Sequence, residues 1–172
     1  MAALLFSTGG AAIKATSFTG LEVAGLRAAL AGVTLAVLVP GALRRLDRRT
    51  LLVGLAYAAT TVLFATSNKL TTAASAIFLQ STAPLYVLFL APFFLAEPVR
   101  RRDLAWLALT AAGLAAIVLG VDDPAATAPA PGLGNLLATV AGFTWAVTVV
   151  GLRWLERASP EAGASGEAGA AA

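Results

Sequence analysis

The sequence predicts an all-α membrane protein, a polytopic transmembrane helical bundle of about six spans. Of its 172 residues, 59% are hydrophobic and 12% are charged, whereas soluble domains carry about 25% charged residues. A helix of about 20 apolar residues crosses the hydrocarbon core of a bilayer. Apolar segments fall at residues 2–17, 22–40, 51–68, 73–96, 104–121 and 133–152. A single soluble domain could not bury all of them, so we expect the chain to lie in a lipid bilayer.

The first two segments differ in how they begin. Segment 2–17 has its positive residue, Lys14, after the apolar run, whereas a secretory signal carries its positive charge before it. The run before Lys14 is short for a span, so we expect the true start of this helix to lie upstream. Segment 22–40 follows a Ser-Phe-Thr-Gly turn and begins with Glu22, an acidic residue that favours a helix N-terminus.

The fourth segment, 73–96, differs from a plain membrane anchor in its prolines and polar residues. It is almost uncharged, ends at Glu97, and is followed by three arginines at 100–102. Pro84 and Pro92 lie inside it, and a proline removes one backbone donor and frees a carbonyl. Lipid tolerates such a break only where protein groups or water satisfy the backbone. With the polar residues of its first half, this pattern predicts one helix that lines a cavity.

The distribution of lysine and arginine predicts the orientation in the membrane. Nine cations follow the second, fourth and sixth segments: Arg44, Arg45, Arg48, Arg49, Arg100, Arg101, Arg102, Arg153 and Arg157. The opposite side carries Lys14, Arg27 and Lys69, and the loop after the fifth segment carries Asp122 and Asp123. Because cytoplasmic loops are enriched in lysine and arginine, we expect a multi-pass protein of the inner or plasma membrane with a cytoplasmic amino terminus.

Two ladders of small residues indicate where helices could pack closely, although an alanine-rich chain also forms such ladders by chance. They are Ala24, Ala28, Gly32 and Ala36 in the second segment, and Ala108, Ala112, Ala116 and Gly120 in the fifth.

Composition excludes most enzyme classes. Without cysteine or histidine the chain has no disulfide, no thiolate chemistry, no zinc site built from those residues and no histidine triad. The stretch GLGN at 132–135 lacks the spacing and the lysine of a phosphate-binding loop. The cations that raise the pI to about 10.0 lie mostly in short loops, which indicates membrane topology rather than nucleic-acid binding. We therefore expect no enzyme activity, no cofactor and no nucleic-acid partner.

Eight residues are candidates for the path of a small-molecule solute: Lys14, Arg27, Asn68, Ser75, Gln80, Ser81, Thr82 and Pro84. If Lys14, Arg27 and Lys69 converge, they form a cationic outer vestibule that favours an anionic solute. Alternatively, their side chains snorkel to the membrane interface, or Arg27 pairs with Glu22. The polar residues either line the path, beside acceptors freed by Pro84, or make interhelical hydrogen bonds worth about 0.6 kcal/mol each.

Several motifs occur in order over most of the chain: AAIK (11–14), GLRAALAG (25–32), DRRTLLVGL (47–55) and the block 64–120, which contains a Ser-x-x-Pro from Ser81 to Pro84 and Glu97. In these motifs the chain resembles the EamA family of the drug/metabolite transporter superfamily. The resemblance implies a secondary transporter of small metabolites or drugs that works by alternating access, often as an exporter. It also implies ten spans in two inverted five-helix repeats.

Measured against that architecture, the chain is truncated. Residues 1–121 correspond to a first repeat, 122–132 to an extracytoplasmic loop, 133–157 to the first helix of a second repeat, and 158–172 to a disordered tail. We therefore expect either that another chain supplies the missing helices, or that this chain is a non-transporting fragment or an accessory membrane subunit.

Overall fold

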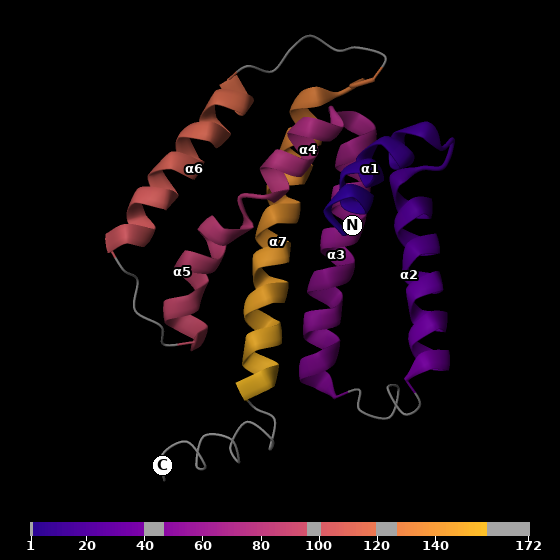
Figure 1. Ribbon diagram of the computed structural model, residues 1–172, viewed down its shortest axis with the longest axis horizontal. Helices are drawn as coiled ribbons and strands as arrows, with labels where there is room; N and C mark the ends of the chain where they lie inside the picture. Colours follow the sequence, from indigo (N-terminus) through magenta and orange to yellow (C-terminus); the bar gives the residue numbers. More distant parts are fainter. Residues whose placement is uncertain (1, 40–46, 96–100, 120–126, 158–172) are drawn as a thin grey trace.

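The computed structural model describes residues 2–39, 47–95, 101–119 and 127–157, which form α-helices joined by short connections (Figure 1). The helices are α1 (Ala2–Ala15), α2 (Gly20–Leu38), α3 (Arg48–Leu70), α4 (Ala73–Gln80), α5 (Ala83–Leu95), α6 (Arg101–Leu119) and α7 (Pro131–Arg157). The predicted all-α helical bundle is confirmed. Within the described ranges, four stretches are long and apolar enough to cross a membrane: α2, α3, α4 with α5, and α7.

The fourth apolar segment gives one candidate span, Ala73–Phe94, whose helix is interrupted near its middle, where the sequence has Pro84. Helix α4 ends at Gln80 and α5 begins at Ala83. The physical reason is Pro84, which has no N–H to donate and whose ring excludes the carbonyl of Gln80, four residues earlier. Pro92, by contrast, lies inside α5.

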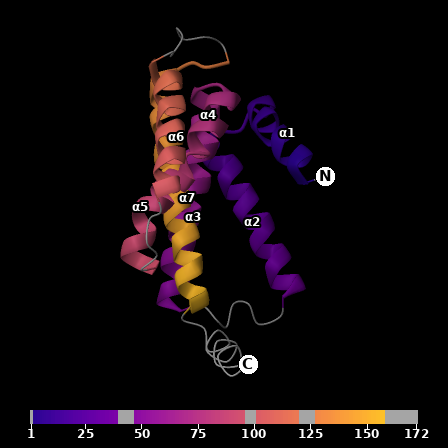
Figure 2. The same cartoon turned by 60° about the vertical axis from the view of Figure 1, so that its left-hand side comes forward.

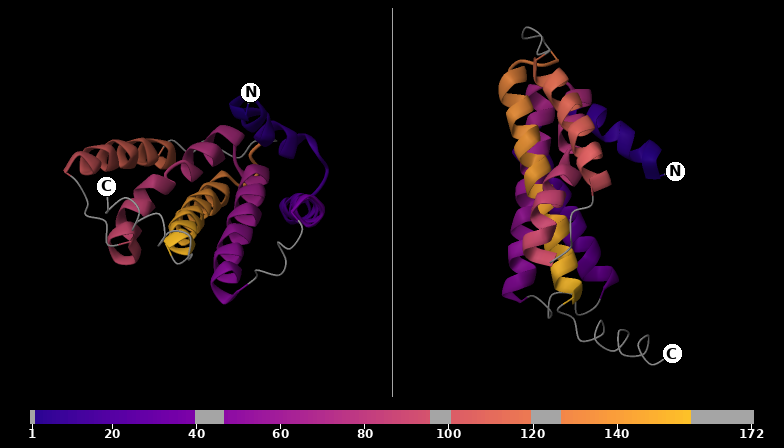
Figure 3. Two further views of the ribbon diagram at one scale, coloured as in Figure 1. Left: turned by 60° about the horizontal axis from the view of Figure 1, so that its bottom comes forward. Right: turned by 90° about the vertical axis from the view of Figure 1, so that its left-hand side faces the viewer.

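Helix α7 lies at the centre of the bundle, between α3 on one side and α4 and α5 on the other (Figures 1 and 3). Eight of its residues are buried, spread along the length of the helix: Gly134, Asn135, Ala138, Ala141, Gly142, Ala146, Thr148 and Val150. Ala138 packs with Ala76 and Leu79 of α4 in a fully buried cluster. These buried residues are mostly small, so the backbones approach closely.

Aromatic residues complete the contacts of α7. Tyr86 of α5 meets Phe143 edge to face, with ring centroids 5.6 Å apart. Tyr57 of α3 lies 6.2 Å from Trp145 between ring centroids, and the guanidinium of Arg49 lies 4.7 Å above the Trp154 ring. The last contact is a cation–π interaction at the end of the α3–α7 pair.

Helix α2 is held mainly by its first turns and is otherwise exposed (Figure 2). Its N-terminus has the acidic start expected from the sequence: the Glu22 carboxylate accepts from the Thr19 backbone N–H at 2.7 Å, and the Glu22 N–H donates to the Thr19 hydroxyl. This capping box satisfies two backbone donors. Of the small-residue ladder, only Ala24 is buried.

The other described ladder residues do not mediate helix packing, and Gly120 lies outside the described residues. Ala28, Gly32 and Ala36 on α2 are exposed, as are Ala108, Ala112 and Ala116 on α6. The contacts that the ladders predicted are made instead by the small residues of α7.

Six of the described cations lie near the two ends of the bundle. Arg48 and Arg49 begin α3, and Arg153 and Arg157 end α7, at the lower end in Figure 1. Lys14 lies in the last turn of α1 and Lys69 in the last turn of α3, at the other end of the bundle. Hydrogen bonds from Thr50 lower the pKa of the Asp47 carboxylate, which caps α3. Several residues used in the topology argument lie outside the described residues: Arg44, Arg45, Glu97, Arg100, Asp122, Asp123 and the tail 158–172.

Candidate functional site

A cluster of buried polar residues lies where α3 turns into α4 and meets the start of α7. It consists of Ser67 and Asn68 in the last turn of α3, Thr71 just after it, and Asn135 in the first turns of α7. We call these four residues the polar cluster. The hydroxyl of Thr71 donates to Asn135 Oδ1 at 2.7 Å, and this hydrogen bond is buried.

Two side chains of the polar cluster bond back onto their own helix. The Ser67 hydroxyl and the Asn68 amide both donate to the Phe64 carbonyl, about one turn earlier in α3, at 2.8 and 3.0 Å. The last carbonyls of a helix, by contrast, have no intrahelical partner and need donors from elsewhere. The Leu70 carbonyl accepts from the backbone N–H of Ala130, just before α7. The α3–α4 turn and the start of α7 are thus joined through the backbone.

Asn68 has no side-chain exposure, and its Oδ1 atom has no hydrogen-bond partner in the described structure. Gly10 of α1 lies over it: a Cβ atom at Gly10 would lie 3.2 Å from Asn68 Oδ1. An unpaired buried acceptor is uncommon, because burial without a partner costs about 1–3 kcal/mol.

The predicted cations come together only in part. Lys69 donates to the Thr16 carbonyl at 2.6 Å, and Lys14 donates to the Thr127 carbonyl. These bonds hold the C-terminal end of α1 against the end of α3 and the segment before α7. Arg27 lies exposed on α2, and the hydrogen bonds of the two lysines do not involve it.

The polar residues predicted in the fourth segment serve the local backbone in the described structure. The Ser75 N–H donates to the Thr72 hydroxyl, which caps α4. The hydroxyl of Ser81 donates to the Ile77 carbonyl at 2.7 Å, and that of Thr82 donates to the Leu79 carbonyl at 2.6 Å. Both acceptors are carbonyls in the last turn of α4, so the two hydroxyls fold back onto the helix that ends just before the break.

These residues do not share one face. Thr82 is buried, Ser75 and Gln80 are half-buried, and Ser81 is exposed. The break itself packs on α7, where a Cβ at Gly142 would lie 3.1 Å from the Leu79 carbonyl oxygen and 3.3 Å from that of Gln80. Much of the first half of this segment therefore packs against α7.

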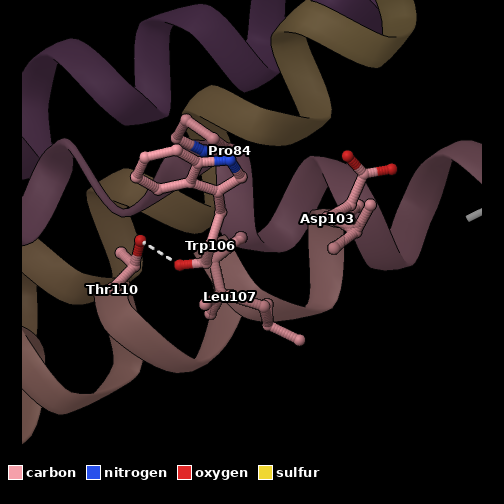
Figure 4. Close-up of a pocket in the computed structure, with 7 residues that line it drawn as sticks. Pro84, Asp103, Trp106, Leu107 and Thr110 are labelled. Carbon is pink, nitrogen blue, oxygen red and sulfur yellow. Dashed lines mark hydrogen bonds between the residues drawn. The ribbon is translucent and has the colours of Figure 1, made fainter. Parts of the chain in front are cut away.

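Pro84 lies apart from the polar cluster, on a small open pocket of about 190 Å³ between α5 and α6 (Figure 4). The pocket is lined by Pro84, Leu85, Leu88, Asp103, Trp106, Leu107 and Thr110. Its lining is mostly apolar, and the Thr110 hydroxyl is already bonded to the Trp106 carbonyl at 2.8 Å. Pro84 and Asn68 therefore do not line one common cavity.

Sequence reasoning missed Thr71, Asn135 and Gly10. Asn135 is the last residue of the GLGN stretch, which is not a phosphate loop. An uncharged polar residue within an apolar span is nevertheless a signal of an interhelical hydrogen bond. No pattern in the sequence indicated that Gly10 lies against Asn68, since the two residues are far apart along the chain.

The polar cluster offers amide and hydroxyl groups, with two ammonium groups nearby. Among the described residues, no group of three or more histidine, cysteine, aspartate or glutamate side chains could hold a metal ion. Amide, hydroxyl and ammonium groups are able to donate and accept hydrogen bonds with a polar solute.

Comparison with known proteins places this arrangement in a family. The model of the EamA-like transporter family matches residues 1–119, which is more than half of the chain and covers α1 to α6. No match was found among curated proteins or among solved structures. Family membership indicates a membrane transporter of the drug/metabolite type, which contacts the lipid bilayer and a small solute. The long apolar helices described above are consistent with this assignment. The chain belongs to the EamA-like transporter family.

Proposed function

We propose that the protein is a secondary transporter that exports small metabolites or drugs across the inner or plasma membrane by alternating access. The observation that carries this proposal, beyond family membership, is the polar cluster. Four polar residues, two of them joined by a buried hydrogen bond, are buried around the α3–α4 turn and the start of α7. Polar groups inside a membrane protein are costly and mark solute paths.

The proposed orientation has a cytoplasmic amino terminus. Arg48, Arg49, Arg153 and Arg157 lie at one end of the bundle, which we assign to the cytoplasm. Lys14 and Lys69 then lie at the outer end, beside the polar cluster. In this proposal residues 1–121 form one repeat and 133–157 begin another, and a further chain supplies the helices that complete the transporter.

Export is tested by drug tolerance. Cells that express the chain are expected to grow at higher concentrations of at least one compound in a panel of toxic metabolites and drugs than cells with an empty vector. They should also accumulate less of that compound. Equal growth and accumulation across the panel, at a verified level of protein in the membrane, would contradict the proposal.

The cations at the outer end are expected to favour anionic solutes. Because Arg27 is exposed, Arg27→Gln removes charge with little structural effect. It should slow the transport of anionic compounds by roughly tenfold at low salt, and less at high salt. Neutral compounds should be unaffected. Arg48→Gln, at the other end of the bundle, is the matched control. Equal rates for both variants with anionic compounds would rule out a cationic outer vestibule.

A further inference from the structure

The unpaired Oδ1 atom of Asn68 is the feature that the fold does not explain by itself. The Asn68 amide donates through Nδ2 to the Phe64 carbonyl at 3.0 Å. This bond determines the orientation of the amide, because a flipped side chain would place two oxygen atoms against each other. The carbonyl oxygen of Asn68 therefore points away from α3 and is left as a free, buried acceptor.

Helix α1 lies over this acceptor. Gly10 packs so closely that an added Cβ would lie 3.0 Å from the Ala73 Cβ and 3.2 Å from Asn68 Oδ1. Among the described helices, α1 makes its main contacts with α3 and α4 only. Figure 2 shows its N-terminal end directed away from the bundle.

Two lysine hydrogen bonds hold the other end of α1. Lys69 reaches from α3 to the Thr16 carbonyl, and Lys14 reaches from α1 to the Thr127 carbonyl. Both bonds are exposed, and exposed polar contacts contribute little stability. Helix α1 can therefore separate from the α3–α4 turn at a lower free-energy cost than α7, which is packed on three helices.

We propose that Asn68 Oδ1 is a binding group for the transported solute, which it recognises through an N–H or O–H donor, and that movement of α1 at Gly10 exposes it. The inference rests on the proposed transport function. While α1 covers Asn68, the Oδ1 atom is buried without a hydrogen-bond partner, which costs free energy. A solute that donates a hydrogen bond to Oδ1 offsets this cost. Compounds without an N–H or O–H group are then poor solutes.

The absence of native cysteine allows a direct test by thiol labelling in membranes. In the Asn68→Cys chain, 2-aminoethyl methanethiosulfonate should react with position 68. The matched control is Leu79→Cys, because Leu79 also has no exposed side-chain area but lies under α7. We expect position 68 to react about tenfold faster or more, which corresponds to an opening free energy about 1.4 kcal/mol lower.

A second change tests the role of the lysine contacts. Lys69→Gln removes the bond to Thr16 and should raise the labelling rate at position 68 but not at position 79. If Asn68→Cys does not fold, Ala73→Cys replaces it in the Lys69→Gln comparison only: Ala73 lies under Gly10 but is partly exposed, so the informative result is a rise in its labelling rate with Lys69→Gln. Equally slow labelling at the α1-covered position and at position 79, with or without Lys69→Gln, would overturn the proposal.

The role as a solute acceptor is tested separately from opening. Asn68→Leu should abolish the tolerance of cells to the exported compound at an unchanged membrane level, whereas unchanged tolerance would overturn the assignment. The labelling experiment needs no solute. A chain that is labelled at position 68 but confers no tolerance in any form therefore refutes the transport proposal, while an unreactive position 68 in a functional transporter refutes only the exposure of Asn68.

Discussion

Gly134→Val is expected to separate α7 from the α3–α4 turn and to lower the stability of the bundle. A Cβ atom at Gly134 would lie 2.6 Å from the Thr71 Cβ, 2.7 Å from the Thr71 nitrogen and 2.9 Å from the Leu70 carbonyl carbon. Two of these three atoms belong to the backbone, so no side-chain rotation can relieve the overlap. Overpacking of this kind costs about 1–3 kcal/mol. Displacement of α7 would also break the buried bond between Thr71 and Asn135.

Intrinsic tryptophan fluorescence during thermal unfolding in detergent measures this effect. Trp145 and Trp154 lie on α7 against Tyr57 and Arg49 of α3, so their emission reports on that contact. A loss of about 1–3 kcal/mol corresponds to a midpoint lower by roughly 2–4 °C per kcal/mol in a chain of this size.

The matched control for this experiment is Gly132→Val, two residues earlier in the same helix. A Cβ at Gly132 would have nothing within 4 Å. This variant should unfold close to the wild-type temperature. If both variants unfolded at the same temperature, close packing of α7 on the α3–α4 turn would be contradicted.

Gly20→Ala is the second substitution for which a large loss is expected. A Cβ atom there would lie 2.5 Å from the Thr66 Cα and 2.6 Å from its nitrogen. Gly20 and Ala24 are the buried residues of α2, so this overlap acts where α2 is anchored. We expect a cost of about 1–3 kcal/mol, through displacement of α2 from α3.

Gly25→Ala is a control for which the expected change in stability has the opposite sign. Gly25 lies in the same helix with nothing within 4 Å of an added Cβ, and alanine is favoured over glycine inside a helix by about 0.5–1 kcal/mol. Thermal unfolding in detergent should therefore show a lower midpoint for Gly20→Ala and an unchanged or higher one for Gly25→Ala. A higher midpoint for Gly20→Ala would show that α2 does not depend on this contact.

The position of the break in the fourth segment could be predicted only in part. Pro84 indicated a disturbed backbone, and the structure shows two helices there. Whether a proline in an apolar span bends a helix or ends it depends on which groups satisfy the freed carbonyls. Here the hydroxyls of Ser81 and Thr82 donate to carbonyls in the last turn of α4, and Gly142 of α7 packs on the break. That last contact is not visible in the local sequence.

The sequence alone determined the class of this protein: an all-α chain in a bilayer, with six of its described cations near the two ends of the bundle. Hydropathy, helix rise and loop charge are local properties, so each can be read from a single segment. The tertiary structure alone decided that α7 forms the centre of the bundle, that the ladders of α2 and α6 stay exposed, and that Gly10 covers Asn68. The pattern of a helix specifies which of its residues share a face. Which helix packs on that face depends on how closely the two backbones can approach. That approach is set by pairs of residues far apart in the sequence, such as Gly134 and Thr71.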